Sequence, residues 1–261
     1  MKIVVCIKQV PDTTEVKIDP KTNTLIRDGV PSIINPDDKA GLEAALRIKD
    51  ETGAEVTVLS MGPPQADIAL REALAMGADR AILVSDRAFG GADTWATSST
   101  IAGALKKLEY DLVIAGRQAI DGDTAQVGPQ IAEHLKLPSV TYAEDIKLEE
   151  GAVVIKRHFE DRYHLIRVKT PCLITALKEL NEPRYMKVSG IFDAYGEKEV
   201  EVWGAADIDV DPSNLGLKGS PTKVKKSFTK GAKTAGKLFD NLAPADAAKL
   251  IVEKLHEKYI F

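Results

Sequence analysis

The chain has 261 residues, of which 44% are hydrophobic and 28% are charged, and its formal net charge is −4. This length suffices for one substantial buried core with an appendage, and the slightly acidic balance gives no indication of a nucleic-acid partner. The apolar run in Met1–Lys8 is too short for a signal peptide or a membrane span, so we expect a cytoplasmic protein that is not inserted into a membrane.

The first half of the chain repeats a strand followed by a helix. Short apolar runs rich in β-branched residues are typical of parallel strands that are buried on both faces. Their succession predicts an α/β fold with an open, mostly parallel twisted sheet, similar to the Rossmann folds that bind adenine nucleotides at the carboxyl ends of their strands. The predicted strands are Ile3–Ile7, Val56–Leu59, Ala81–Val84 and Leu112–Ala115.

Capping signals mark the helices between these strands. The first helix is expected from Pro36 to about Glu51, because Asn35 can cap its start and Gly53 can end it. Glycine, proline and alanine-rich patterns place two further helices. One follows Gly62–Pro64 and ends at Met76, and the other spans Thr94–Leu108.

The stretch Tyr110–Gly128 joins a buried strand to a polar turn and then to a fourth helix. We expect this helix to begin at Asp123, whose side chain would cap it while Gln126 reaches back. Backbone N–H groups at a helix start carry partial positive charge, which suits a phosphate. The stretch therefore predicts a nucleotide site.

After Pro138 the pattern changes to strands without intervening helices, which predicts an antiparallel extension of the sheet. With this extension, residues 1–189 form the expected nucleotide-binding domain. The extension consists of Val140–Leu148, Ala152–His158, Tyr163–Lys169 and Cys172–Leu177.

Beyond Tyr185 the sequence loses its α/β character, and Pro212–Phe239 has seven lysines without an acidic residue. Such a segment is either a solvated tail or an arm that orders against another subunit. Because Leu242–Tyr259 then resumes an apolar helical pattern, we favour the arm and assign it residues 190–261.

Four segments are expected to meet at the carboxyl edge of the sheet: Lys8–Pro11, Ser60–Pro63, Ser85–Thr97 and Gly116–Val127. Each alone is compatible with an ordinary turn, but together they predict a nucleotide that crosses the edge. In the third segment two glycines allow close backbone approach, and Thr94 and Thr97 offer hydroxyls one helical turn apart. Asp93 is equally well explained as an N-cap.

Enzymatic chemistry leaves little trace in the sequence. The four histidines are scattered, the two cysteines lack metal-site spacing, and the phosphate-loop, GxGxxG and GxSxG motifs are absent. Asp121 and Asp123 can bind Mg²⁺, although turn chemistry is the simpler reading. We therefore assign neither catalytic residues nor a metal site, and any redox chemistry requires a bound cofactor.

Four separated motifs together resemble the β (small) subunit of electron-transfer flavoprotein. The resemblance covers essentially the whole chain, in the expected order. The motifs are Val4–Asp12, Ile34–Asp38, Ala115–Gly128 and Leu180–Tyr185.

In that family the β subunit pairs with a larger α subunit that carries an electron-shuttling FAD. Ordinary members hold AMP in the β subunit, whereas electron-bifurcating members hold a second FAD there. The segment Ser85–Thr97 resembles the bifurcating version, and Gly122 stands where many AMP-binding members have an acidic residue. The resemblance therefore implies bifurcation, with AMP binding as the alternative.

The implied reaction starts with NADH, which passes hydride to the β-bound FAD. One electron then goes to ferredoxin or flavodoxin, and the other goes through the α-subunit FAD to an acyl-CoA dehydrogenase. The family's contacts, carried over by motif, imply cofactor binding by Ile7, Lys8, Gln9, Val10, Asn35, Asp37, Asp38, Ser60, Met61, Gly62, Asp93, Thr94, Thr97, Gly116, Arg117, Gln118, Asp121, Gly122, Asp123, Thr124, Ala125, Gln126 and Val127.

The motif Leu180–Tyr185 resembles the family's docking loop, whose leucine inserts into the partner dehydrogenase. It comprises Leu180, Asn181, Glu182, Pro183, Arg184 and Tyr185. A protruding Leu180 fits that role, whereas a buried Leu180 would be purely structural.

Two other classes remain open. A stand-alone adenine-nucleotide-binding regulatory module explains the pocket but not the long arm. A nucleotide-dependent ligase or pyrophosphatase requires a glycine-rich loop after the first strand, and Lys8–Asp12 is not one.

Overall fold

The structure is a computed structural model that describes residues 1–12, 17–18, 25–26, 31–225 and 235–260. The chain divides into two compact units, Met1–Lys225 and Lys226–Phe261. Each is described by itself below.

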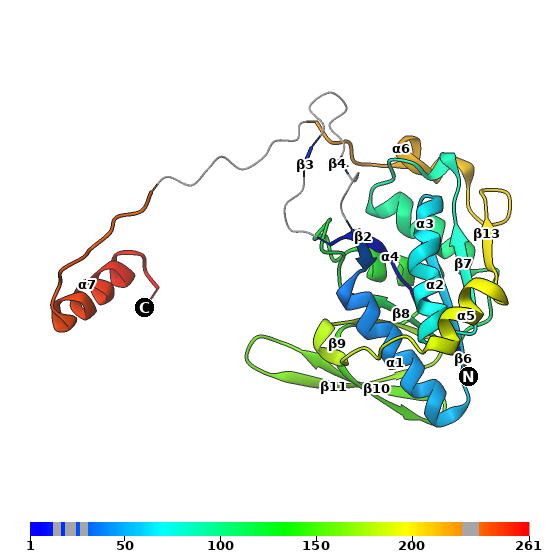
Figure 1. The fold of residues 1–261 in the computed structure, drawn as a ribbon, viewed down its shortest axis with the longest axis horizontal. Helices are drawn as coiled ribbons and strands as arrows, with labels where there is room; N and C mark the ends of the chain where they lie inside the picture. The colour runs from blue at the N-terminus through cyan, green and yellow to red at the C-terminus, as the bar shows by residue number, and fades with distance from the viewer. Residues whose placement is uncertain (13–16, 19–24, 27–30, 226–234, 261) are drawn as a thin grey trace. The chain divides into compact units, whose positions relative to one another are not determined.

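In the described part of the first unit, nine strands form one sheet in the order β11-β10-β9-β12-β8-β1-β6-β7-β13 (Figure 1). Each neighbouring pair of strands from β9 to β13 in this order is parallel, whereas β10 pairs antiparallel with both β9 and β11. The predicted open, mostly parallel α/β sheet is thus confirmed. The strands are β1 (Lys2–Cys6), β6 (Glu55–Met61), β7 (Arg80–Val84), β8 (Leu112–Gly116), β9 (Ser139–Glu149), β10 (Ala152–His158), β11 (Tyr163–Lys169), β12 (Cys172–Ala176) and β13 (Val200–Trp203).

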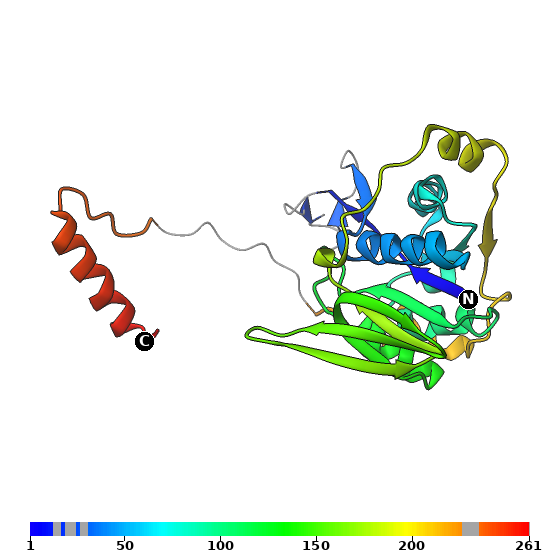
Figure 2. The same ribbon diagram turned by 90° about the horizontal axis from the view of Figure 1, so that it is seen from below.

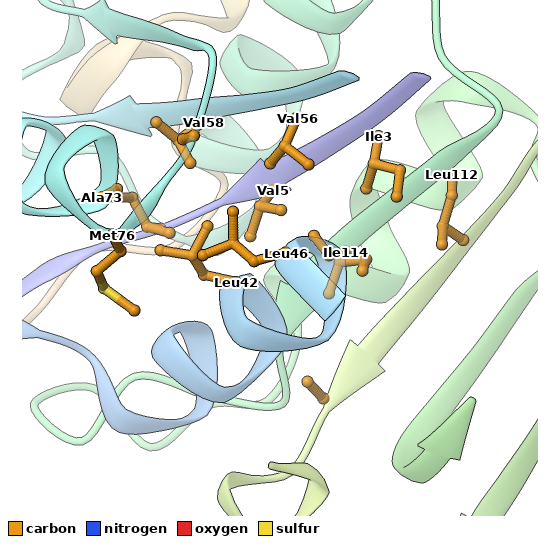
Figure 3. Close-up of a cluster of buried hydrophobic side chains, with 14 of the residues drawn as sticks. Ile3, Val5, Leu42, Leu46, Val56, Val58, Ala73, Met76, Leu112 and Ile114 are labelled. Carbon is orange, nitrogen blue, oxygen red and sulfur yellow. The ribbon is translucent and has the colours of Figure 1, made fainter. Parts of the chain in front are cut away.

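Helices on both faces explain why the central strands are continuously apolar. Alternate residues of β1 point into two separate hydrophobic clusters, with Val5 in one and Val4 in the other. Figure 3 shows Leu42 and Leu46 close to Val5 in the first cluster. Because helices cover both faces of the sheet, the side chains on both faces of a central strand are buried. Apolar residues therefore follow one another along the strand and do not alternate with polar ones.

The helices confirm most of the predicted boundaries. Gly53 ends the first helix with φ 72°, the left-handed conformation that glycine adopts without strain. The first two helices, α1 and α2, contribute to one hydrophobic cluster, and the next two contribute to the other. Their bounds are α1 (Pro36–Thr52), α2 (Asp67–Met76), α3 (Thr94–Leu105) and α4 (Val127–Leu135).

The expected start of the fourth helix at Asp123 was wrong, because α4 begins at Val127. Asp123 and Ala125 have φ values of 50° and 52°, which interrupt a right-handed helix. Gln126 does not reach back to Asp123, and its Oε1 instead accepts a hydrogen bond from Thr94 Oγ1 at 2.8 Å.

The antiparallel extension is smaller than expected. Within the described nine-stranded sheet only β10 runs opposite to the other strands, and in Figure 2 β10 and β11 form the long green hairpin at one end of the sheet. Cys172–Leu177 was wrongly assigned to the extension, because β12 lies between β8 and β9 and is parallel to both. All five residues of β12 are buried, as a central strand requires.

The α/β unit continues to Lys225, further than the 189 residues assigned to it from the sequence. After α5 (Val188–Gly196), β13 adds a strand beside β7. An ion pair between Arg80 and Glu201, with Nε and Oε1 2.5 Å apart, joins the two strands. The expectation that the α/β character ends at Tyr185 was therefore wrong.

Smaller elements complete this unit. Two short antiparallel pairs are β2 (Gln9–Pro11) with β5 (Ser32–Ile34), and β3 (Lys17–Ile18) with β4 (Leu25–Ile26). Short 3₁₀ turns lie at Pro64–Ala66, Arg87–Phe89, Lys178–Leu180 and Pro212–Asn214, and α6 spans Gly216–Gly219.

The second unit contains α7 (Pro244–Glu257), where the sequence predicted an apolar helix. Its residues Ile251 and Val252 are exposed. The lysine-rich prediction for Pro212–Phe239 falls partly on residues 226–234, which lie outside the described residues. No helix among the described residues combines the length and the apolar character needed to cross a bilayer.

Candidate functional site

A cavity of about 1070 Å³ lies at the carboxyl edge of the sheet. Its lining comes from the segments after β1, β6, β7 and β8 and from the first turns of α3 and α4. These are the segments that the sequence predicted to converge. Such an edge is where open parallel sheets bind ligands.

Most of the residues proposed for cofactor binding line this cavity. They are Ile7, Lys8, Gln9, Asp38, Ser60, Met61, Gly62, Asp93, Thr94, Thr97, Gly116, Arg117, Gln118, Gly122, Thr124, Ala125, Gln126 and Val127. Val10, Asn35, Asp37, Asp121 and Asp123 do not belong to the lining, although several of them bond to residues that do.

Sequence reasoning missed several lining residues. Ile101 and Ile131 lie on α3 and α4 beyond the predicted loops, and each reads as an ordinary core residue in the sequence. Thr222 lines the cavity from a distant segment. Only the folded chain brings this residue to the site, because no local motif marks it.

Asp38 joins the ends of two strands beneath the cavity. Its carboxylate accepts hydrogen bonds from Lys8 N at 2.8 Å and Gly116 N at 2.9 Å. A Cβ on Gly116 would lie 2.0 Å from Asp38 Oδ1, so a side chain has no room there. Burial raises the pKa of Asp38 to about 7, although these hydrogen bonds oppose the rise.

Asn35 shapes the cavity without lining it. It occupies the N-cap position of α1 as expected, but its side chain makes no capping hydrogen bond. Its Nδ2 instead donates to Gln118 O at 2.8 Å, and its Oδ1 accepts from Ile120 N at 3.0 Å. These two bonds fix the loop after β8 to the start of α1.

Two acidic side chains hold the cationic residues of the cavity. Lys8 Nζ lies 2.6 Å from Asp121 Oδ1, and Arg117 Nε lies 3.3 Å from Asp37 Oδ2. Burial raises the pKa of Asp37, and the Arg117 charge opposes this rise. Asp37 and Asp121 therefore position the positive charges of the site.

The loop before α4 can hold an anion. Its left-handed residues Asp123 and Ala125 lead the chain into the first turn of α4, where backbone N–H groups lack intrahelical partners. A Cβ on Gly128 would lie 2.6 Å from Thr175 Cγ2, so the helix packs very closely on β12.

Ser60 gives an independent indication of a ligand. Its side chain lines the cavity but is only 1% exposed, and Oγ has no hydrogen-bond partner among the described residues. A buried hydroxyl without a partner is costly, and a ligand atom would remove the cost. Together with the loop before α4, it shows that the residues present fit a nucleotide.

The described residues do not meet the requirements of a metal site. No group of three or more His, Cys, Asp or Glu side chains in the described ranges is arranged to hold a metal ion.

The predicted docking residues lie along α1, away from the cavity lining. Leu180 is partly buried and packs against the core, whereas Tyr185 is 95% exposed. Arg184 forms ion pairs with Glu43 and Asp50, each with atoms 2.8 Å apart. Asn181 contacts Ala40 O at 3.5 Å, while Glu182 is exposed and Pro183 is partly buried.

The chain matches the family model described as "Electron transfer flavoprotein domain" over residues 22–208. It is 64% identical to "Electron transfer flavoprotein subunit beta" of Clostridium acetobutylicum over 259 residues, which cover 99% of each chain. The chain belongs to the electron transfer flavoprotein family.

Within the electron transfer flavoprotein family, the chain is a β subunit, and β subunits pair with α subunits. It is 60% identical to "Caffeyl-CoA reductase-Etf complex subunit CarD" of Acetobacterium woodii, over the whole of both chains. It is also 48% identical to "Acryloyl-CoA reductase electron transfer subunit gamma" of Anaerotignum propionicum, again over both whole chains. The latter two names attach those relatives to acyl-CoA reductase systems.

Proposed function

We propose that this β subunit binds FAD in the cavity and, paired with its α subunit, bifurcates electrons from NADH. Ferredoxin or flavodoxin would receive one electron, and an acyl-CoA dehydrogenase would receive the other. The proposal rests chiefly on the extent of the cavity, which continues from the loop before α4 to the segment Arg87–Thr97. FAD consists of AMP joined to a larger half that carries the flavin ring. The cavity offers room for AMP beside the loop before α4 and for the flavin half beside Arg87–Thr97.

Glycines and an apolar wall shape the second half of the cavity. Gly90 and Gly91 line this part of the cavity, and Phe89 and Ile101 offer apolar surface. A Cβ on Gly122 would meet no heavy atom within 4 Å, so the loop before α4 is open there. These features favour a flat ring system beside the phosphates.

In this arrangement the chain's residues bind and orient the cofactor. The N–H groups of Thr124–Val127 and the charges of Lys8 and Arg117 would hold the phosphates, and Ser60 would hydrogen-bond the nucleotide. When bound, FAD supplies the capacity to take hydride and release single electrons. The chain itself contributes position and electrostatics.

Electron delivery requires contact with a dehydrogenase. We assign this contact to Leu180–Tyr185, because Tyr185 is 95% exposed and Val188 and Phe192, just beyond it, are exposed as well. The relatives named as subunits of acyl-CoA reductase systems support a partner of this class. The second unit, with its exposed apolar side chains on α7, would bind the α subunit.

The deciding measurement is the nucleotide content of the purified heterodimer. Cofactors are released by denaturation, and FAD and AMP are quantified for each αβ pair. We expect two FAD and no AMP. One FAD and one AMP would make the protein a simple electron shuttle and contradict bifurcation.

A variant tests whether the flavin part of FAD lies beside the segment Arg87–Thr97. Thr97→Phe places a large ring in the cavity on the β7 side, so FAD binding in the β subunit should fall while AMP binding persists. Equal loss of both nucleotides would contradict the assigned orientation. The matching activity assay follows the reduction of ferredoxin by NADH. Bifurcation requires this reduction to occur only when the dehydrogenase and its electron acceptor are present.

A further inference from the structure

One wall of the cavity comes from a segment that the family motifs do not include. We call residues Gly216–Thr222 the strap. The strap contains α6 and ends at Thr222, which lines the cavity. It lies against the loop Arg87–Asp93, more than a hundred positions earlier in the chain.

The strap fits this loop closely. Gly216 has φ 55°, and a Cβ on it would lie 2.2 Å from Ala88 O. Leu217 N donates a hydrogen bond to Gly90 O at 2.9 Å. Position 216 therefore requires glycine for two reasons, its left-handed backbone conformation and its close contact with Ala88 O.

Asp93 fastens the far end of the strap. Its Oδ2 accepts from Thr222 N at 3.0 Å and from Thr222 Oγ1 at 2.7 Å. Its backbone N donates to Ser220 Oγ at 2.8 Å, and Ser220 Oγ donates to Gly216 O at 2.8 Å. The chain of bonds runs from the loop through the strap and back.

Both carboxylate oxygens of Asp93 are engaged by protein groups. Oδ1 accepts from Ala96 N at 3.0 Å, which caps α3, and Oδ2 holds Thr222. Asp93 lines the cavity as expected of a cofactor contact, and its carboxylate also makes these bonds within the protein. Thr222 donates its hydroxyl proton to Asp93, so its oxygen remains as an acceptor beside the cavity.

We propose that Thr222 contacts the flavin half of the bound dinucleotide and that Asp93 is a positioning residue that acts through Thr222. The inference rests on the proposed FAD site. Because the oxygen of Thr222 is an acceptor, the group that it meets is a donor, either a hydroxyl of the ribityl chain or a ring N–H. Thr222 therefore favours FAD over AMP, which lacks that half.

The test compares FAD and AMP affinities in the αβ heterodimer after the β-site nucleotide has been removed. Thr222→Val removes the hydroxyl at nearly constant volume, and Thr222→Ser restores it. We expect Val to weaken FAD binding about tenfold, the size of one neutral hydrogen bond, with AMP binding unchanged and Ser close to wild type. Unchanged FAD affinity in Thr222→Val would overturn the inference.

Asp93→Asn tests the positioning role. Asn has a single oxygen, so when that oxygen caps α3 the Nδ2 group faces Thr222 and accepts neither of its bonds. FAD binding should therefore weaken, and trypsin should cut faster at Lys218 and Lys223. The matched control is Asp211→Asn, because Asp211 Oδ1 likewise accepts from a backbone N and a hydroxyl, both of Ser213, but lies outside the cavity lining. Equal effects of the two variants would overturn the role of Asp93.

The same titrations separate this inference from the proposed function. A wild-type heterodimer that takes AMP but never FAD in the β subunit contradicts the proposed function. If the wild-type heterodimer binds FAD in the β subunit and Thr222→Val binds it with the same affinity, only the role of Thr222 is contradicted.

Discussion

Glu43 is a buried carboxylate on α1 that depends on Arg184 for its partner. It is 3% exposed and accepts hydrogen bonds from Arg184 N at 3.0 Å and Arg184 Nε at 2.8 Å. Arg47 Nε adds a further contact at 3.0 Å from a more exposed position. This pair holds the chain after Leu180 against the helix.

Replacing Arg184 with Ala should lower the free energy of unfolding by about 3 kcal/mol, because it leaves the Glu43 charge buried with one cation fewer. Arg47→Ala is the matched control, and its loss should stay within about 0.5 kcal/mol because the i,i+4 pair is partly solvated. Urea unfolding of the isolated subunit at neutral pH measures both. Equal losses would contradict the burial argument.

The same pair gives a pH dependence. Burial raises the pKa of Glu43, but hydrogen bonds from Arg184 and Arg47 outweigh burial and hold the pKa below its ordinary value of 4.5. Its contribution is therefore complete above pH 4.5 and is lost as the pH falls through the lower pKa of the folded state. The difference between wild type and Arg184→Ala should accordingly shrink in unfolding curves taken below that pH.

At the residue scale, the sequence predicted where polar side chains gather better than what they do. Asn35, Asp93 and Asp121 were assigned to the cofactor, yet their oxygens and nitrogens bond to protein groups. Asn35 bonds to a residue 83 positions away and Asp93 to one 129 positions away. Such partners are set by the fold, so local capping patterns do not identify them.

At the element scale, the segment from Leu180 onward combines a seated part with an exposed part. Leu180 packs partly on the core, whereas the following residues Tyr185, Val188 and Phe192 are between 72% and 95% exposed. A dehydrogenase that binds here would meet an apolar surface of fixed position. Apolar side chains at the centre of an interface usually dominate its energy.

Leu180→Ala should therefore raise the KM for the dehydrogenase while leaving the nucleotide content of the heterodimer intact. Leu165→Ala on β11 is the control, because Leu165 is an exposed leucine of the same unit, 66% exposed, outside the segment Leu180–Tyr185. Thermal melts of both variants separate lost packing from lost docking. An unchanged KM would remove the docking assignment.

The sequence predicted which segments are strands or helices more accurately than it predicted the position of each strand in the sheet. The strands at Leu112–Ala115 and Cys172–Leu177 read alike, and the strand order placed both in the interior of the sheet. The segment that became β13 was missed, because a strand of only four residues carries little periodicity. Long-range pairing decides strand order, and no local window contains it.

At the scale of the whole molecule, the two compact units suggest a division of labour. The first holds the cavity, and the second holds α7 with exposed apolar residues. A chain that ends at Lys225 should keep the circular dichroism spectrum and melting temperature of the α/β unit but no longer assemble with the α subunit. Size-exclusion chromatography of co-expressed subunits measures the loss. Stable assembly without residues 226–261 would contradict the proposed role of the second unit.

The placement of Thr222 has a consequence for assembly. It lies three residues before the boundary of the first unit at Lys225, so the strap that lines the cavity is also the stretch of chain that leads into the second unit. Releasing the strap would lengthen the connection between the sheet and α7, and a longer connection lowers the effective concentration at which a tethered segment meets its binding site. Under the proposed function, a substitution at Asp93 would then slow subunit association as well as weaken cofactor binding, although Asp93 lies in the first unit and not in the second.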